Sequence, residues 1–311
     1  METNNEEQED CNYKLSRHEE GFSPETVLLI GNGVIENGNI PLEEVVFGYE
    51  TSSEYGQHKK SEHTQELAIV LLARMAFYYR SNAERLLLKA ARIEKLNEDN
   101  FREIDEIGPY LHIVRNFIIK LAKAYNEATK SSEISFRDRA LFNKFYSNDS
   151  TGIVTINGDE VLWNDSSIDN IIQLHGRCSI SDSLVLPTEM IIDANIFKLH
   201  EENLLKNNVA LKTDYLSRYF RGTKNIRQSL EDAHGIAYDW LRNAKTMIIW
   251  GIAFNAYDAE LISLFQSPPF NELEKIVIIN TNSDHGNIAK EIVGEGAVRI
   301  DIDPITGEEI N

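Results

Sequence analysis

The stretch that decides the fold reads Val27-Leu-Leu-Ile-Gly-Asn-Gly33. Four consecutive apolar residues that run into a glycine turn predict a buried parallel strand with a tight turn at its carboxyl end. Glycine at positions 31 and 33 permits positive φ and lets backbone amides approach a phosphate closely, at the start of a helix or loop. A glycine-rich β-turn without any ligand explains this short pattern equally well.

Apolar runs of strand length alternate with helical patterns along the 311-residue chain. We predict further strands at residues 152–156, 170–174, 184–186, 246–250 and 275–279. Apolar residues at three-and-four spacing predict helices at residues 64–79, 83–96, 110–128 and 225–242. This alternation favours an α/β protein with a Rossmann-like doubly wound parallel sheet and a helical insertion or subdomain.

The predicted Rossmann-like domain spans residues 25–303. Within it, residues 64–135 form either a helical insertion or crossover helices that cover the sheet, and residues 194–244 form a second helical region, broken near 221–223. Residues 1–24 are acidic and polar and are predicted to be a disordered tail. Residues 304–311 are predicted to be a short C-terminal tail.

The composition narrows the classes of partner. A formal net charge of -19 disfavours direct binding to nucleic acid or to an anionic membrane, because both need Lys and Arg to neutralise phosphates. The two cysteines, Cys11 and Cys178, supply neither a disulfide framework nor a four-cysteine zinc site. This cysteine usage predicts a protein of the reducing cytoplasm without a bound metal. The sequence also contains no apolar run long enough to span a membrane and no secretory signal.

Polar residues and glycines gather at the predicted strand ends. The segments are Gly31-Asn-Gly33, Thr155-Ile-Asn-Gly-Asp159, Leu174-His-Gly176 and Gly251-Ile-Ala-Phe-Asn-Ala-Tyr-Asp258. In a doubly wound sheet the carboxyl ends of the strands border the ligand crevice, so these segments are expected to meet there.

The order of these motifs resembles the sirtuin superfamily, in particular the NAD-consuming domains of prokaryotic anti-phage systems, with features of the AbiH abortive-infection group. The first turn leads to an Ile-Pro pair at Ile40, as in that family, and the last strand ends in Ile279-Asn280. The other matching positions are Thr155, Asn157 and Asp159; Leu174, His175 and Gly176; and Gly251, Asn255 and Asp258.

The resemblance implies an NAD glycohydrolase that cleaves NAD to nicotinamide and ADP-ribose. Such cleavage develops positive charge on the ribose C1 carbon, so the protein has to hold the dinucleotide and place a water. It implies that Asn157 orients the water or a ribose hydroxyl, that His175 accepts a proton, and that Asp159 stabilises charge or orients its neighbours. As alternatives, Asn157 is a turn-forming residue, His175 a structural hydrogen-bonding residue and Asp159 a helix cap. The implied NAD-binding residues are Gly31, Asn32, Gly33, Thr155, Gly176, Gly251, Asn255 and Asn280.

Three positions depart from the family pattern. Ile35 replaces a Ser or Asp, Asn39 replaces a glycine, and Gly158 replaces an aromatic residue. These changes favour an alternative, a sensor or scaffold subunit that binds NAD or ADP-ribose without turnover. The zinc-ribbon cysteines of deacylating sirtuins are missing from the sequence, which argues against protein deacylation.

The resemblance also implies a biological setting, because an unrestrained NAD-consuming enzyme would poison its own cell. The expected role is abortive-infection defence against phage. The expected means of control are a homo-oligomer or a separately encoded activator such as a HerA-like ATPase, by analogy alone.

Overall fold

The computed structural model describes residues 14–38, 40–47, 116–180, 183–184, 224–252, 273–279 and 297–310. Several predictions lie outside these residues: the helices before residue 116, the region at 194–223, and Asn39, Asn255, Asp258 and Asn280. Within the described segments, no helix is both long and apolar enough to cross a membrane.

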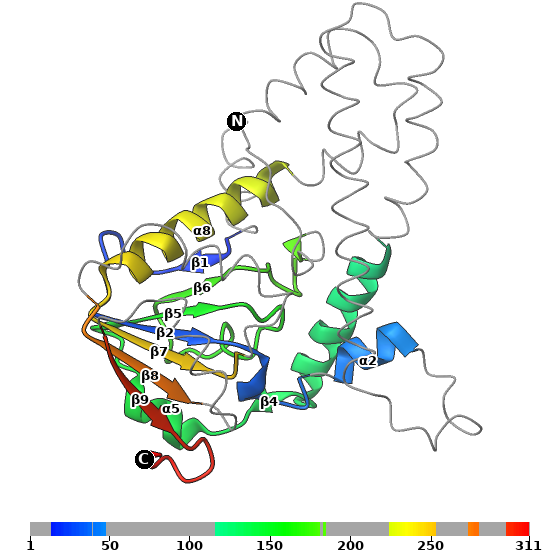
Figure 1. Cartoon of the computed structure of the whole chain (residues 1–311). Helices are drawn as coiled ribbons and strands as arrows, with labels where there is room; N and C mark the ends of the chain where they lie inside the picture. Colours follow the sequence, from blue (N-terminus) through cyan, green and yellow to red (C-terminus); the bar gives the residue numbers. More distant parts are fainter. Residues whose placement is uncertain are drawn as a thin grey trace, which may run out of the picture.

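The core is a seven-stranded sheet in the order β1-β6-β5-β2-β7-β8-β9 (Figure 1). The strands are β1 (Ser16–Arg17), β2 (Thr26–Ile30), β5 (Thr151–Thr155), β6 (Ile171–Gln173), β7 (Thr246–Trp250), β8 (Lys275–Ile279) and β9 (Val298–Ile302). All neighbours pair in parallel except β1, which pairs antiparallel with β6. Without β1, the strands follow the Rossmann order 3-2-1-4-5-6 along the chain, so the predicted Rossmann-like α/β fold is confirmed.

Helices cover both faces of the sheet. Alternate residues of β2 point in opposite directions: Val27 and Leu29 pack with the apolar side of α8 (Lys224–Asn243), which lies along one face in Figure 1. Leu28 and Ile30 pack on the other face, against α5 (Arg139–Phe145). Burial on both faces explains why the central strands are continuous apolar runs.

The chain leaves β2 through Gly31 into a single 3-10 turn, η2 (Asn32–Val34), and then into β3 (Ile35–Glu36). β3 pairs with β4 (Ser135–Phe136), and the helix α2 (Ile40–Phe47) follows β3 in the chain. A further helix covers residues 116–131, which agrees with the described part of the helix predicted at 110–128 and extends it by three residues.

The predicted strands at 246–250 and 275–279 are confirmed, those at 152–156 and 170–174 are confirmed with slightly different ends, and α8 confirms the helix predicted at 225–242. The strand predicted at 184–186 is wrong at Leu184, which lies in no strand, while the next two residues lie outside the described segments. Leu184 instead packs with Leu121 and Ala122 of the helix at 116–131. Its neighbour Ser183 donates its backbone N–H to the Ile180 carbonyl at 2.8 Å.

The disordered tail predicted for residues 1–24 is wrong from residue 14 onward. Leu15 is buried in the core, and Ser16–Arg17 form the edge strand β1. The apolar side chain of Leu15 and the pairing of β1 with β6 fix this segment, although its composition is polar. At the other end, residues 303–310 fold back on β9, with the Asp303 N–H bonded to the Glu308 carbonyl.

Candidate functional site

The carboxyl ends of β2 and β5 meet at Asn157. The parallel register pairs Ile30 with Thr155, so the residues after each strand emerge at the same edge of the sheet. The Asn157 side-chain amide donates to the Gly31 carbonyl at 3.3 Å, and its backbone N–H donates to the Thr155 hydroxyl oxygen at 3.1 Å. Asn157 is only 6% exposed, and within the described segments its Oδ1 has no hydrogen-bond partner.

Asp159 lies two residues further on and is 2% exposed. Its Oδ1 accepts the Val161 N–H at 3.0 Å, while its Oδ2 is buried without a partner in the described part of the chain. Burial disfavours the charged form, so the pKa of Asp159 rises to about 6, from an ordinary value of 3.8. The carboxyl group therefore titrates close to neutral pH.

His175 follows β6 at the same edge and is 7% exposed. The residue before it, Leu174, donates its N–H to the Thr155 carbonyl, which ties this segment to β5. The residue after it, Gly176, has φ +82, and a Cβ there would lie 1.9 Å from the Ser183 carbonyl oxygen. The turn that carries His175 therefore requires glycine at this position.

The glycines after β2 pack against the end of β7. The Gly31 N–H donates to the Trp250 carbonyl at 2.9 Å, and the Gly33 N–H donates to the Gly251 carbonyl at 3.1 Å. A Cβ on Gly31 would lie 2.4 Å from the carbonyl oxygen of Gly251, and a Cβ on Gly33 would lie 2.8 Å from the Cα of Gly251. Close backbone packing thus requires both glycines. Both amides donate to protein carbonyls in this structure, and the NAD-binding role that the resemblance implies for Gly31 and Gly33 stays a prediction.

The remaining described residues of the predicted NAD set occupy the same strand ends. Thr155 is the last residue of β5, and Gly251, with φ +69, directly follows β7. Asn32 is half-buried in η2, and its Oδ1 fills the space where a Cβ on Gly38 would lie. The structure therefore brings the described predicted residues to one edge of the sheet.

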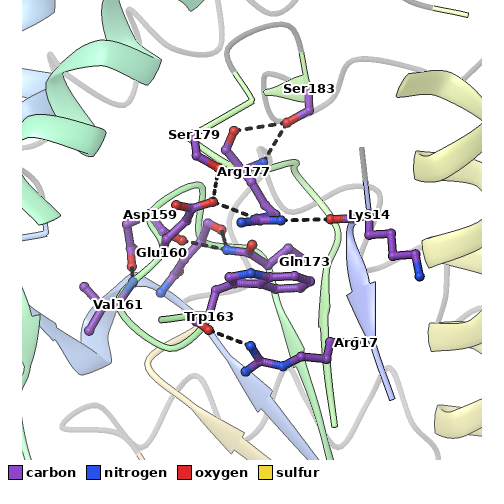
Figure 2. Close-up of polar contacts among 11 residues, drawn as sticks. Lys14, Arg17, Asp159, Glu160, Val161, Trp163, Gln173, Arg177, Ser179 and Ser183 are labelled. Atoms are coloured by element: carbon purple, nitrogen blue, oxygen red, sulfur yellow. Dashed lines mark hydrogen bonds and ion pairs between the residues drawn. The ribbon is translucent and has the colours of Figure 1, made fainter. Parts of the chain in front are cut away.

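A network of polar side chains on β6 and on the loops after β5 and β6 was not predicted from the sequence. Gln173, the last residue of β6, donates its side-chain amide to the carbonyls of Asn157 and Asp159. The Arg177 guanidinium forms an ion pair with the buried Glu160 at 2.7 Å, and Glu160 also accepts a hydrogen bond from the Ser179 hydroxyl (Figure 2). The sequence signal for Gln173 was its place directly before Leu-His-Gly.

The same network reaches the N-terminal strand. Figure 2 shows the Trp163 ring between two guanidinium groups, with Arg177 at 4.0 Å and Arg17 at 5.1 Å from the ring centroid. Arg177 also donates to the Lys14 carbonyl, and Arg17 donates to the Trp163 and Ile168 carbonyls. The segment that was expected to be disordered therefore supports the loop after Asp159.

Two further titratable groups lie near Asp159. Burial and the negative charges of Glu160 and Asp159 raise the pKa of Cys178 to about 12, so its thiol stays protonated at neutral pH. Burial, and then the charge of Asp159, raises the pKa of the Tyr125 hydroxyl on the helix at 116–131. Among the described residues, no group of three or more His, Cys, Asp or Glu side chains could hold a metal ion.

No family model, curated protein or solved structure matches this chain. The fold defines a Rossmann-like α/β protein, and its buried amide and carboxyl side chains lie at the carboxyl edge of the sheet, next to the switch point between β2 and β7.

Proposed function

We propose that this protein binds NAD at the carboxyl edge of its sheet and hydrolyses the nicotinamide N-glycosidic bond. The observation that carries the proposal is the position of Asn157. Its amide bonds to Gly31 beside the switch point, and its buried Oδ1 lacks a partner among the described residues. A buried acceptor of this kind is normally satisfied by a donor, and ribose hydroxyls and water are both donors.

In the proposed reaction the bond between the ribose C1 and the nicotinamide nitrogen breaks, and its electron pair neutralises the pyridinium ring. Water supplies the new C1–O bond and loses one proton, which gives ADP-ribose and nicotinamide. Asp159, with its pKa of about 6, suits proton acceptance near neutral pH, and His175 is the second candidate base. The positive charge that develops on C1 would also favour the ionised form of the Asp159 carboxyl.

A specific observation supports binding without turnover as the second candidate. Ile35, where the sirtuin-like pattern has a polar residue, is buried in the core and pairs with Phe136. At Gly158, where the pattern has an aromatic residue, even a Cβ would lie 2.9 Å from the side chain of Leu184. Two positions associated with the ligand in that pattern therefore serve packing in this chain.

Nicotinamide release from NAD by the purified full chain tests the proposal. Asn157→Ala and His175→Ala should each lower the release rate at least about 100-fold while the protein stays folded. Matched controls are Asn170→Ala, a buried amide at the opposite end of β6, and His18→Ala, a histidine next to β1; both should stay within about threefold of wild type.

The outcomes separate the candidates. NAD binding without nicotinamide release, both alone and with an added HerA-like ATPase, would favour the sensor. Neither binding nor release would refute both functions, and normal turnover by both site variants would refute the site assignment.

By the resemblance alone, we propose a role in anti-phage abortive infection for the same activity. Control by self-association or by a HerA-like ATPase would fit such a role. Light scattering, with nicotinamide release measured across a range of protein concentrations, tests the first route. Specific activity that is independent of concentration would contradict it.

A further inference from the structure

Each of the three backbone carbonyls in the turn from Asn157 to Asp159 accepts a hydrogen bond from outside the turn. The Gln173 side-chain amide donates to the Asn157 carbonyl at 3.3 Å and to the Asp159 carbonyl at 2.6 Å. Between them, the Gly158 carbonyl accepts the Cys178 N–H at 2.9 Å. Every one of these hydrogen bonds comes from β6 or from the residues that directly follow it.

Gln173 is itself firmly placed. It is 1% exposed and pairs with Thr155 in the parallel ladder between β5 and β6. Its backbone N–H donates to the carbonyl of Leu15, the residue before β1, at 2.9 Å, so the N-terminal segment holds it from the other side. Figure 2 shows the Gln173 side chain reaching from its strand into the turn at Asp159. The side-chain amide of Gln173 can therefore fix the turn at Asp159 relative to the sheet.

We propose that Gln173 is a positioning residue that sets where Asn157 and Asp159 point. This inference rests on the proposed NAD hydrolysis at the same site. The turn contains Gly158, whose backbone has the widest conformational freedom, so the turn needs external bonds to keep one geometry. A misplacement of about 1 Å at a reacting centre lowers a rate by about 100-fold.

Gln173→Met tests the inference, because methionine keeps the length of the side chain and removes both donated hydrogen bonds. We expect kcat for nicotinamide release to fall at least about tenfold with KM within about threefold, since the NAD-binding residues on the other strands are unchanged. Asn170→Leu is the matched control. Asn170 is 2% exposed and donates its side-chain amide to the Asn148 carbonyl at 2.8 Å, at the opposite end of β6. Its kcat should not change.

A second variant supplies a pH signature. In Gln173→Glu the carboxyl group can donate only when protonated, and burial raises its pKa. The ratio of its kcat to that of wild type should therefore rise as the pH falls from about 8 to about 5, whereas the ratio for Gln173→Met should stay flat. Equal ratios across this range for both variants would contradict donation by residue 173.

Backbone hydrogen exchange makes the test independent of the reaction. Gln173→Met should speed exchange about tenfold in the peptide that covers residues 157–161, and Asn170→Leu should leave that peptide unchanged. Unchanged exchange in Gln173→Met, or a kcat equal to that of the Asn170 control, overturns the inference. A wild-type protein that releases no nicotinamide instead refutes the proposed function, and faster exchange in Gln173→Met would then still support positioning of the turn.

Discussion

Asp159→Asn should change how the free energy of unfolding depends on pH. The folded-state pKa of Asp159 is about 6 against an ordinary 3.8, so the folded protein binds this proton more tightly than the unfolded chain does. The associated stability is fully present below pH 3.8 and is lost as the pH rises through about 6. Since one pKa unit corresponds to 1.36 kcal/mol, the loss amounts to about 3 kcal/mol.

The asparagine variant carries no charge at any of these pH values and keeps an oxygen that can accept the Val161 N–H. Relative to wild type, it should therefore gain up to about 3 kcal/mol of stability between pH 4 and pH 7. Urea unfolding followed by tryptophan fluorescence at intervals of one pH unit measures this difference. Nicotinamide release, assayed on the same samples, should fall in the variant, so stability and activity move in opposite directions.

Asp165→Asn is a control with the opposite sign. Partial burial raises the pKa of Asp165, but hydrogen bonds from Ser167 and Arg139 outweigh this effect and hold the pKa below its ordinary value. Its contribution to stability is therefore present above the unfolded-state pKa and lost as the pH falls, and the variant should lose stability relative to wild type toward neutral pH. If the difference between Asp159→Asn and wild type stayed constant from pH 4 to pH 7, the carboxyl group would be hydrated and our account of its burial would be wrong.

Two further perturbations follow from the packing. Gly251→Ala should destabilise the fold by at least about 2 kcal/mol in urea unfolding, because it places a Cβ at φ +69 and 2.8 Å from the backbone nitrogen of Val34. Gly235→Ala is the control: this residue lies in α8 with open space around it, so the variant should stabilise the fold by about 0.5–1 kcal/mol. Glu160→Ala should cost about 3 kcal/mol by the same measurement, since it leaves the Arg177 guanidinium without its buried partner, and a loss below about 1 kcal/mol would mean that solvent reaches this pair.

The parts of the fold that could be predicted are those with one physical solution. The runs at Val27–Ile30 and Thr246–Trp250 are apolar at nearly every position, which suits only a strand buried on both faces. The helix α8 was predictable because its apolar residues repeat at helical spacing. The grouping of strand-end residues followed from the parallel sheet, in which all carboxyl ends share one edge.

The parts that could not be predicted depend on partners distant in sequence. β1 has only two residues, and its place is set by pairing with β6 and by the burial of Leu15. The alternating strand β9 carries Arg299 and Asp301, whose mutual ion pair makes charged residues compatible with a strand at the sheet edge. The contacts of Arg177 likewise join residues up to 163 positions apart, which no local pattern encodes.

The Gly-Asn-Gly turn illustrates how one sequence pattern can have two physical causes. Gly31 and Gly33 are required by contact with Gly251 whether or not a dinucleotide binds, so substitutions there would report on folding rather than on a ligand. Asn157 and Asp159 differ, because their buried Oδ1 and Oδ2 atoms are each left without a donor in the described part of the chain and lie at the carboxyl edge of the sheet. The Oδ1 of Asn170 also lacks a donor there, but it lies at the opposite end of β6. Burying an acceptor without a donor costs the free energy of its lost hydration, and no hydrogen bond from the described protein residues offsets this cost. A ligand that carries hydroxyl groups, or a water held beside it, would recover that free energy on binding, so Asn157 and Asp159 are the positions at which binding and folding can be separated.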